Sequence, residues 1–264
     1  MKRGPLFLAI LVGLAGCASS DEAPTAAPSD QVSATQGSQE DHSGTPSPLP
    51  VVPSEAVTFR ASDGTRIEGR LFGDGQVAIV LAHQVDQVQS AWYAFAGELA
   101  GRGYVALTFN FRGYCPGGAD GCSGEGSVGT DGWQDVAGAV RFLNERGVKR
   151  VYLTGASIGG LAVLEAAVRG VPVDGVVTLS GVPTVGYDIT RADLSRLDIP
   201  LVFVVGRFDG SLARAVRRVH RLAPEPKELM VLPTGEHGTN LLRYAAPKVQ
   251  AKLRELLYAT YGHP

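Results

Sequence analysis

The sequence predicts an α/β fold in which helices flank an open, mostly parallel sheet of eight strands. Two observations predict it. From residue 77 onward, short apolar runs alternate with segments of helical periodicity, which is the pattern of consecutive strand–helix–strand units. Several of these runs are apolar at every position, as expected of strands that are covered on both faces. Right-handed crossovers between such strands build one parallel sheet.

The elements are expected in a regular order. Residues 56–71 alternate around Asp63-Gly64 and predict a β-hairpin with that pair as its turn. Further strands are expected at residues 77–82, 104–109, 151–154, 173–179, 201–205 and 229–232. Helices are expected at residues 90–102, 161–168, 191–197, 212–222 and 247–258, and one more from a cap at Thr130 or Asp131 to about Gly147. Sites in such sheets lie beyond the carboxyl ends of the strands, so the residues after each strand are the functional candidates.

The amino-terminal residues do not belong to this fold. A basic start and a short apolar run end in Leu14-Ala15-Gly16-Cys17, which is typical of a secretory signal peptide over residues 1–16. The end of the run also resembles the bacterial lipobox, which implies an exported protein anchored to a membrane of the cell envelope through lipidated Cys17. An ordinary secretory signal with a chance cysteine is the alternative. Residues 17–52 lack apolar periodicity and are expected to form a disordered tether.

Composition limits what the rest of the chain can be. Of 264 residues, 44% are hydrophobic, and the formal net charge is -2. The chain can therefore bury one sizeable core, and it has no basic excess for binding nucleic acid. We expect one domain over residues 53–264, and the sequence leaves its oligomeric state open.

Two cysteines, Cys115 and Cys122, flank a loop-forming stretch of Pro, Gly, Ala and Asp. In a chain that is expected to be exported, a disulfide between them is the economical interpretation. Zinc binding is the alternative, but the spacing is not that of a two-cysteine knuckle and no histidine lies close in sequence. We expect a disulfide and no metal.

The stretch from Gly155 to Gly159 has the pattern G-x-S-x-G of a nucleophile elbow, with Ser157 at its centre. An apolar strand is expected before it and an apolar helix after it. The glycines indicate a tight turn whose backbone torsions would be obstructed by neighbouring side chains. The pentapeptide alone is weak support, because glycines also surround serines in ordinary strand-to-helix turns.

A serine nucleophile needs a base, usually an imidazole that a carboxylate orients. Asp209 follows the strand expected at residues 201–205, and His237 follows the strand expected at residues 229–232. The chain order Ser157, Asp209, His237 places the three residue types of a catalytic triad after three expected strands. Other interpretations remain: Asp209 could cap the next helix, and His237 could be a surface-loop histidine.

Together these stretches resemble the α/β-hydrolase family, and within it the dienelactone hydrolase-like enzymes and small esterases, over about residues 55–261. The resemblance is carried by Leu81-Ala82-His83-Gln84-Val85, Asn110-Phe111-Arg112-Gly113-Tyr114, Gly155 to Gly160, Gly206 to Asp209 and His237-Gly238. It implies a triad of Ser157, Asp209 and His237. It also implies an oxyanion hole formed by the backbone N–H groups of Val85 and Ile158. Relatives usually carry His-Gly where this chain has His83-Gln84, so the Gln84 side-chain amide is an alternative donor.

The resemblance implies a serine hydrolase that cleaves carboxylic esters through an acyl-enzyme and needs no cofactor. Related enzymes with a lid insert it where only about 20 residues separate Ser180 from Leu201, so no substantial cap domain is expected. Such an open site suits a small-molecule ester with a short or water-soluble acyl group. An acyltransferase or a peptidase similar to the prolyl oligopeptidase group would use the same triad. A tethered binding protein without turnover is the alternative from another class.

Overall fold

The computed structural model describes residues 53–181 and 189–264. The predicted signal peptide, the tether and Cys17 lie outside the described residues. Within the described ranges, no helix is long and apolar enough to cross a membrane.

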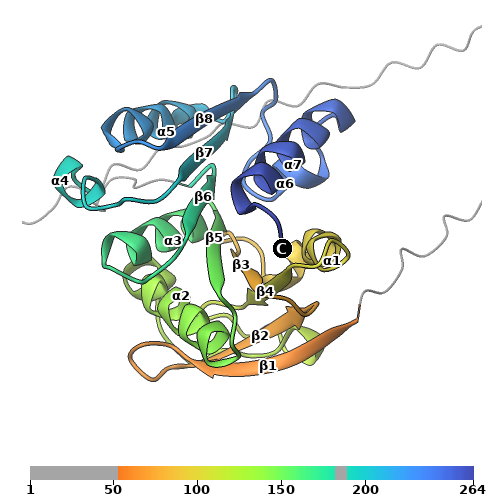
Figure 1. Ribbon diagram of the computed structural model, residues 1–264. Helices are drawn as coiled ribbons and strands as arrows, with labels where there is room; N and C mark the ends of the chain where they lie inside the picture. The colour runs from red at the N-terminus through yellow and green to blue at the C-terminus, as the bar shows by residue number, and fades with distance from the viewer. Residues whose placement is uncertain (1–52, 182–188) are drawn as a thin grey trace, which may run out of the picture. The chain divides into compact units, whose positions relative to one another are not determined.

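In the described part of the chain, eight strands form one sheet (Figure 1). They are β1 (Ser54–Arg60), β2 (Arg66–Phe72), β3 (Val77–Ala82), β4 (Val105–Phe109), β5 (Arg150–Ala156), β6 (Gly175–Leu179), β7 (Leu201–Gly206) and β8 (Lys227–Leu232). Their order is β1-β2-β4-β3-β5-β6-β7-β8. The hairpin of β1 and β2 joins β4 antiparallel, and all pairs from β4 to β8 are parallel. This confirms the predicted fold class.

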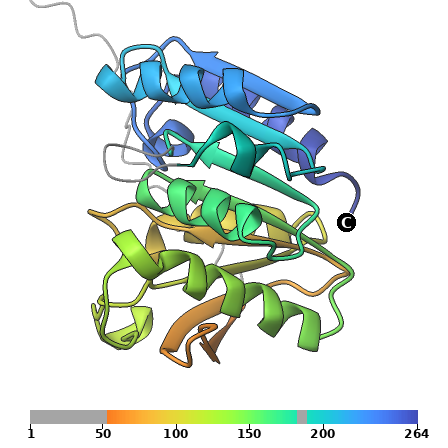
Figure 2. The same cartoon turned by 90° about the vertical axis from the view of Figure 1, so that its left-hand side faces the viewer.

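Helices cover both faces of this sheet (Figures 1 and 2). One face carries α2 (Val128–Glu145), α3 (Ile158–Val168) and α5 (Gly210–Leu222), and the other carries α1 (Tyr93–Ala100) and α7 (Pro247–Tyr261). The short elements are η1 (Gln89–Trp92), η2 (Gly118–Asp120), α4 (Arg191–Leu194) and α6 (Asn240–Arg243). Each face therefore has its own hydrophobic core.

The strand β3 shows why its sequence run is apolar at every position. Successive side chains of a strand point to opposite faces of the sheet. Ala78, Val80 and Ala82 belong to the core under α2 and α3. Val77, Ile79 and Leu81 belong to the core under α1 and α7. A strand between two helical layers needs an apolar side chain at each position.

The start of α2 differs from the prediction. The expected cap at Thr130 or Asp131 is wrong, because the helix begins at Val128 and Ser127 is its N-cap residue. The Asp131 carboxylate instead accepts hydrogen bonds from Thr130 Oγ1 and Gln134 Nε2. Asp131 still lies in the first turn, where the helix dipole favours a negative charge. Asp131 therefore marked the first turn of the helix and not its cap.

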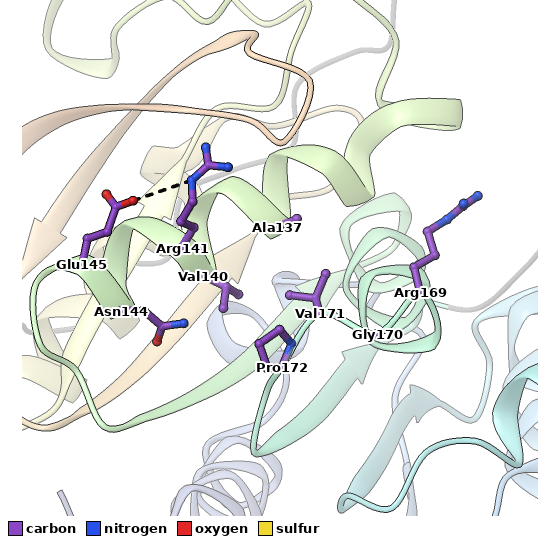
Figure 3. Close-up of a pocket in the computed structure, with 9 residues that line it drawn as sticks. All are labelled: Ala137, Val140, Arg141, Asn144, Glu145, Arg169, Gly170, Val171 and Pro172. Carbon is purple, nitrogen blue, oxygen red and sulfur yellow. Dashed lines mark ion pairs between the residues drawn. The ribbon is translucent and has the colours of Figure 1, made fainter.

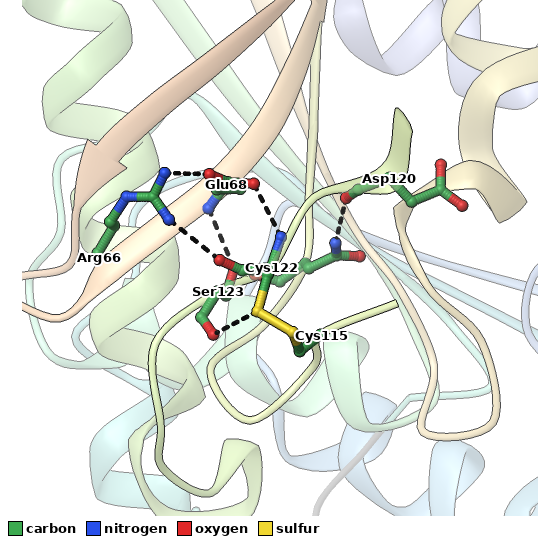
Figure 4. Close-up of a disulfide and its surroundings, with 7 residues drawn as sticks. Arg66, Glu68, Cys115, Asp120, Cys122 and Ser123 are labelled. Atoms are coloured by element: carbon green, nitrogen blue, oxygen red, sulfur yellow. Dashed lines mark hydrogen bonds and ion pairs between the residues drawn. A yellow bond between two sulfur atoms is a disulfide. The ribbon is translucent and has the colours of Figure 1, made fainter. Parts of the chain in front are cut away.

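The loop after β4 is closed by a disulfide between Cys115 and Cys122 (Figure 4). Its end is bound to β2, because the Cys122 N–H donates to Glu68 Oε2 at 2.8 Å and the Glu68 N–H donates to Ser123 Oγ at 3.0 Å. Arg66 Nη1 also donates to the Cys122 carbonyl at 3.2 Å. Among the described residues, no group of three or more His, Cys, Asp or Glu side chains could hold a metal ion.

Replacing both Cys115 and Cys122 with Ala is expected to lower the free energy of unfolding by about 2.5 kcal/mol. Without the covalent loop, the unfolded chain has more conformational entropy and is more stable. Urea unfolding of the variant and of the wild-type chain measures this difference. Adding a thiol reductant should reproduce the loss in the wild type and leave the variant unchanged. A variant as stable as the oxidised wild type would show that the bridge contributes nothing.

Candidate active site

Ser157 stands between β5 and α3 in a strained backbone conformation, with φ 51° and ψ -117°. A Cβ at Gly155 would lie 2.2 Å from the Gly159 carbonyl oxygen, and a Cβ at Gly159 would lie 2.4 Å from the Ala82 carbonyl oxygen. Both distances are far below van der Waals contact. The glycines are therefore required because backbone from α3 and from β3 approaches them closely, and the half-buried serine is held at the carboxyl edge of the sheet.

Asp209 and His237 face each other across the ends of β7 and β8. His237 Nδ1 lies 3.0 Å from Asp209 Oδ2 and 3.2 Å from Oδ1. Asp209 occupies the N-cap position of α5, but its side chain makes no capping hydrogen bond. The carboxylate therefore binds the imidazole and not the helix terminus. This contact favours the tautomer with hydrogen on Nδ1, which leaves Nε2 free to accept a proton.

The loop that carries His237 packs against the loops that carry Ser157 and Val85. Gly238 has φ 55°, and a Cβ there would lie 2.1 Å from Gln84 Oε1 and 3.4 Å from the Ala156 Cβ. Within the described residues, the His237 ring forms hydrogen bonds with Asp209 alone, so none joins it to Ser157. Such a bond is often long until substrate binds. The structure thus brings His237 to Asp209 and brings the His237 loop to the elbow.

Two backbone N–H groups are candidates for an oxyanion hole. Ile158 is the first residue of α3, where an N–H has no acceptor inside the helix. Val85 follows β3, and its carbonyl accepts a hydrogen bond from the Tyr114 hydroxyl at 2.7 Å. The side chain of Gln84 is used differently, because its Nε2 donates to Asp86 Oδ1 at 2.8 Å. One hydrogen of the Gln84 amide is therefore engaged by Asp86.

Thr239 was not singled out by sequence reasoning, although it lies two residues after His237. Its N–H donates to Gln84 Oε1 at 3.0 Å, and its hydroxyl lies 3.1 Å from the same oxygen. The two residues are 155 positions apart in the chain. A lone threonine in a loop carries no periodic signal, so only its polar character beside His237-Gly238 could have drawn attention to it.

His83 is fully buried, and both of its ring nitrogens face backbone groups. Its Nδ1 lies 2.8 Å from the Gln84 carbonyl oxygen, and its Nε2 accepts a hydrogen bond from the Phe111 N–H at 3.1 Å. Burial lowers the pKa of His83 to about 4. A neutral ring with hydrogen on Nδ1 satisfies both contacts, so His83 holds the backbone at the end of β3.

Among the described residues, exposed apolar side chains gather beyond the carboxyl edge of the sheet. Three large hydrophobic side chains there, Val85, Phe208 and Tyr244, are 62%, 70% and 63% exposed. They follow β3, β7 and α6. Between β6 and β7, the described residues contain one helix, the four-residue α4. The edge therefore offers an apolar rim without a substantial covering element in the described residues.

A hollow of about 620 Å³ lies elsewhere, between α2 and the turn after α3 (Figure 3). Val140, Arg141, Val171 and Pro172 are among the residues that line it. These residues precede the amino ends of β5 and β6, whereas Ser157 follows the carboxyl end of β5. The hollow is therefore at the edge of the sheet opposite to the candidate active site.

Comparison with known proteins decides the family. The model of the family described as "Alpha/beta hydrolase family" matches residues 42–261. The chain belongs to the alpha/beta hydrolase family. The uncharacterized protein YfhR of Escherichia coli is 27% identical to this alpha/beta hydrolase over 211 residues, which cover 70% of this chain and 73% of YfhR.

Solved structures have the same fold. An esterase of Pyrococcus furiosus matches with a TM-score of 0.65 and 16% identity, over 80% of this chain and 92% of that one. A dienelactone hydrolase of Anabaena variabilis matches with a TM-score of 0.59 and 17% identity, over 79% of this chain and 96% of that one. The resemblance that the sequence motifs predicted is confirmed at the level of family and fold.

Proposed function

We propose that this alpha/beta hydrolase is a serine hydrolase that cleaves carboxylic esters. The observation that carries the proposal is the Asp209–His237 pair, whose loop packs beside the strained turn of Ser157. An aspartate in the N-cap position that binds an imidazole and not its own helix fits a catalytic role better than a structural one. The esterase names of the solved structures with the same fold point to the same chemistry.

In the proposed mechanism, Ser157 Oγ attacks the acyl carbonyl while His237 Nε2 takes the hydroxyl proton. Asp209 holds the imidazole tautomer and stabilises the imidazolium that forms. The N–H groups of Val85 and Ile158 bind the oxyanion of the tetrahedral intermediate. His237 then gives the proton to the leaving alcohol. A water molecule, deprotonated by the same histidine, hydrolyses the acyl-enzyme and restores Ser157.

The short connection of about 20 residues between Ser180 and Leu201 supports a small ester with a short or water-soluble acyl group as substrate. We expect the full chain to hydrolyse p-nitrophenyl acetate and butyrate, with kcat/KM falling as the acyl chain lengthens toward palmitate. A series of nitrophenyl esters, assayed below their critical micelle concentrations, gives this profile. Preference for long-chain triglyceride with activation at an oil surface would contradict the proposed substrate class.

The same triad supports an acyltransferase or a peptidase as second candidates. Product analysis with an added alcohol separates transfer from hydrolysis, because a transferase forms the new ester in preference to the free acid. Peptide and ester substrates of equal acyl group separate a peptidase from an esterase. If no substrate turns over and no fluorophosphonate probe labels the protein, a tethered binding protein becomes the better interpretation.

Replacing Asp209 with Asn is expected to lower kcat by about 10⁴-fold, because an amide can hold the wrong histidine tautomer. KM should change little, since Asp209 does not contact the substrate in this mechanism. The control is Asp198→Asn, which removes an exposed carboxylate before β7. Full activity of Asp209→Asn would assign this aspartate a structural role only.

We also propose that the protein is exported and anchored to a membrane of the bacterial cell envelope through lipidated Cys17. The support is the sequence from Leu14 to Cys17, which resembles a lipobox. Detergent phase partition of the chain produced in a bacterial host tests it. The wild type should enter the detergent phase and Cys17→Ala should not. Equal partition of both would reject the anchor.

A further inference from the structure

Gln84 lies at the junction of the two loops that hold the proposed oxyanion donor and the proposed base. It directly follows His83 at the end of β3, and its side chain is 2% exposed. A buried amide is costly unless its polar atoms are bonded, which makes its partners informative.

The side chain of Gln84 is bound to the His237 loop. Its Oε1 accepts the hydrogen bond from the Thr239 N–H at 3.0 Å and lies 3.1 Å from the Thr239 hydroxyl. Any Cβ at Gly238 would collide with this oxygen at 2.1 Å. The segment that follows His237 is thus built closely around one atom of Gln84.

The backbone of Gln84 sets the direction of the Val85 N–H. The Gln84 carbonyl oxygen accepts hydrogen bonds from His83 Nδ1 at 2.8 Å and from the Gln87 N–H at 3.2 Å. The carbonyl and the next N–H belong to one planar trans peptide and point in opposite directions. With the carbonyl held toward the buried His83 ring, the Val85 N–H must point away from it.

We propose that Gln84 is a positioning residue that holds the Val85 N–H and the His237 loop in one fixed arrangement. Its carbonyl orients the oxyanion donor, and its side-chain oxygen sets the place of the base relative to that donor. This role rests on the proposed function. Because a misplacement of about 1 Å can cost about 100-fold in rate, a single residue that joins both groups controls kcat.

The test compares two buried glutamines in the full chain. Gln84→Met keeps the length of the side chain and removes its bonds to Thr239 and Asp86. The matched control is Gln89→Met, since Gln89 is 1% exposed and binds Thr108 and Asp120 but not the His237 loop. Gln84→Met is expected to lower kcat by about 10- to 100-fold with KM changed less than about 2-fold, and Gln89→Met is expected to retain kcat.

Thr239 supplies a rescue experiment at the other end of the contact, where its hydroxyl lies 3.1 Å from Gln84 Oε1 and donates to Gln87 Oε1 at 2.6 Å. Thr239→Val removes the hydroxyl and is expected to lower kcat by about 10-fold, whereas Thr239→Ser should restore it. Because the hydroxyl is also bonded to Gln87, these variants test the hydroxyl, and Gln84→Met tests the Gln84 side chain itself. If Gln84→Met retains the kcat of Gln89→Met, the positioning role is wrong.

Hydrogen exchange gives a readout that does not require turnover. Exchange of the Thr239 amide should accelerate at least about 10-fold in Gln84→Met and stay unchanged in Gln89→Met, because its acceptor is lost only in the first. Unchanged exchange would overturn the inference whether or not the chain hydrolyses esters. A wild type without ester turnover or probe labelling would instead reject the proposed function.

Discussion

Replacing Ser157 with Ala is expected to lower kcat for ester hydrolysis by about 10⁴-fold or more, because no other group can form the acyl-enzyme. Labelling by a fluorophosphonate probe should disappear at the same time. The backbone of Ser157 has a positive φ of 51° that alanine must also adopt, so thermal unfolding is measured beside activity. A folded but inactive variant identifies Ser157 as the nucleophile.

The control for this experiment is Ser195→Ala. Ser195 is exposed after α4, and its hydroxyl donates to the Ala192 carbonyl at 2.8 Å, far along the chain from the elbow. We expect unchanged turnover and labelling. If Ser157→Ala keeps the wild-type rate, the hydrolysis observed would come from another group, and the triad would be wrong.

Replacing Arg112 with Met is expected to lower the free energy of unfolding by about 3–5 kcal/mol, because it leaves a buried carboxylate without its partner. Arg112 is 4% exposed, and its Nε and Nη2 donate to Asp135 Oδ1 at 2.9 and 2.8 Å. The Asp135 side chain is fully buried. Urea unfolding measures the loss, and the melting temperature should fall by about 10 °C.

Arg146→Met is the matched control, because Arg146 pairs with Glu55 at 3.2 Å on the exposed surface. This variant is expected to lose less than about 1 kcal/mol. A double variant, Arg112→Met with Asp135→Leu, should recover most of the stability, since it removes both buried charges. Equal losses for Arg112→Met and Arg146→Met would show that burial does not decide the value of the pair.

The ion pairs of Arg112 with Asp63 and Asp135 also make the free energy of unfolding depend on pH. The side-chain hydrogen bond from Arg112 holds the pKa of Asp63 well below its usual range, whereas burial raises the pKa of Asp135. Asp63 is the more exposed of the two, so its carboxylate stays charged and hydrated. A lowered folded-state pKa stabilises the fold above the unfolded-state value of about 4, and this contribution is lost as pH falls further. Asp63→Asn should remove that part of the acid sensitivity.

Local patterns in the sequence determined most of the elements. Apolar runs predicted the parallel strands because a strand between two layers of helices exposes neither face to water. The glycines around Ser157 indicated a tight turn, and the triad order followed from reading the residues after the strands. Such signals depend on neighbours within a few positions. For the same reason the sequence predicted the start of α2 at the wrong residue, since Ser127 at the N-cap and Asp131 in the first turn are both residue types common at a helix start.

Contacts between distant segments were decided only by the tertiary structure. The sequence left Asp209 as either a helix cap or the partner of His237, and the order of β7 and β8 in the sheet brings it to the imidazole. The sequence offered the Gln84 side chain only as an oxyanion donor, and packing placed Thr239, 155 residues away, against its side-chain oxygen. Hydrogen bonds of this kind are set by which strand ends share an edge, and no local periodicity encodes that arrangement.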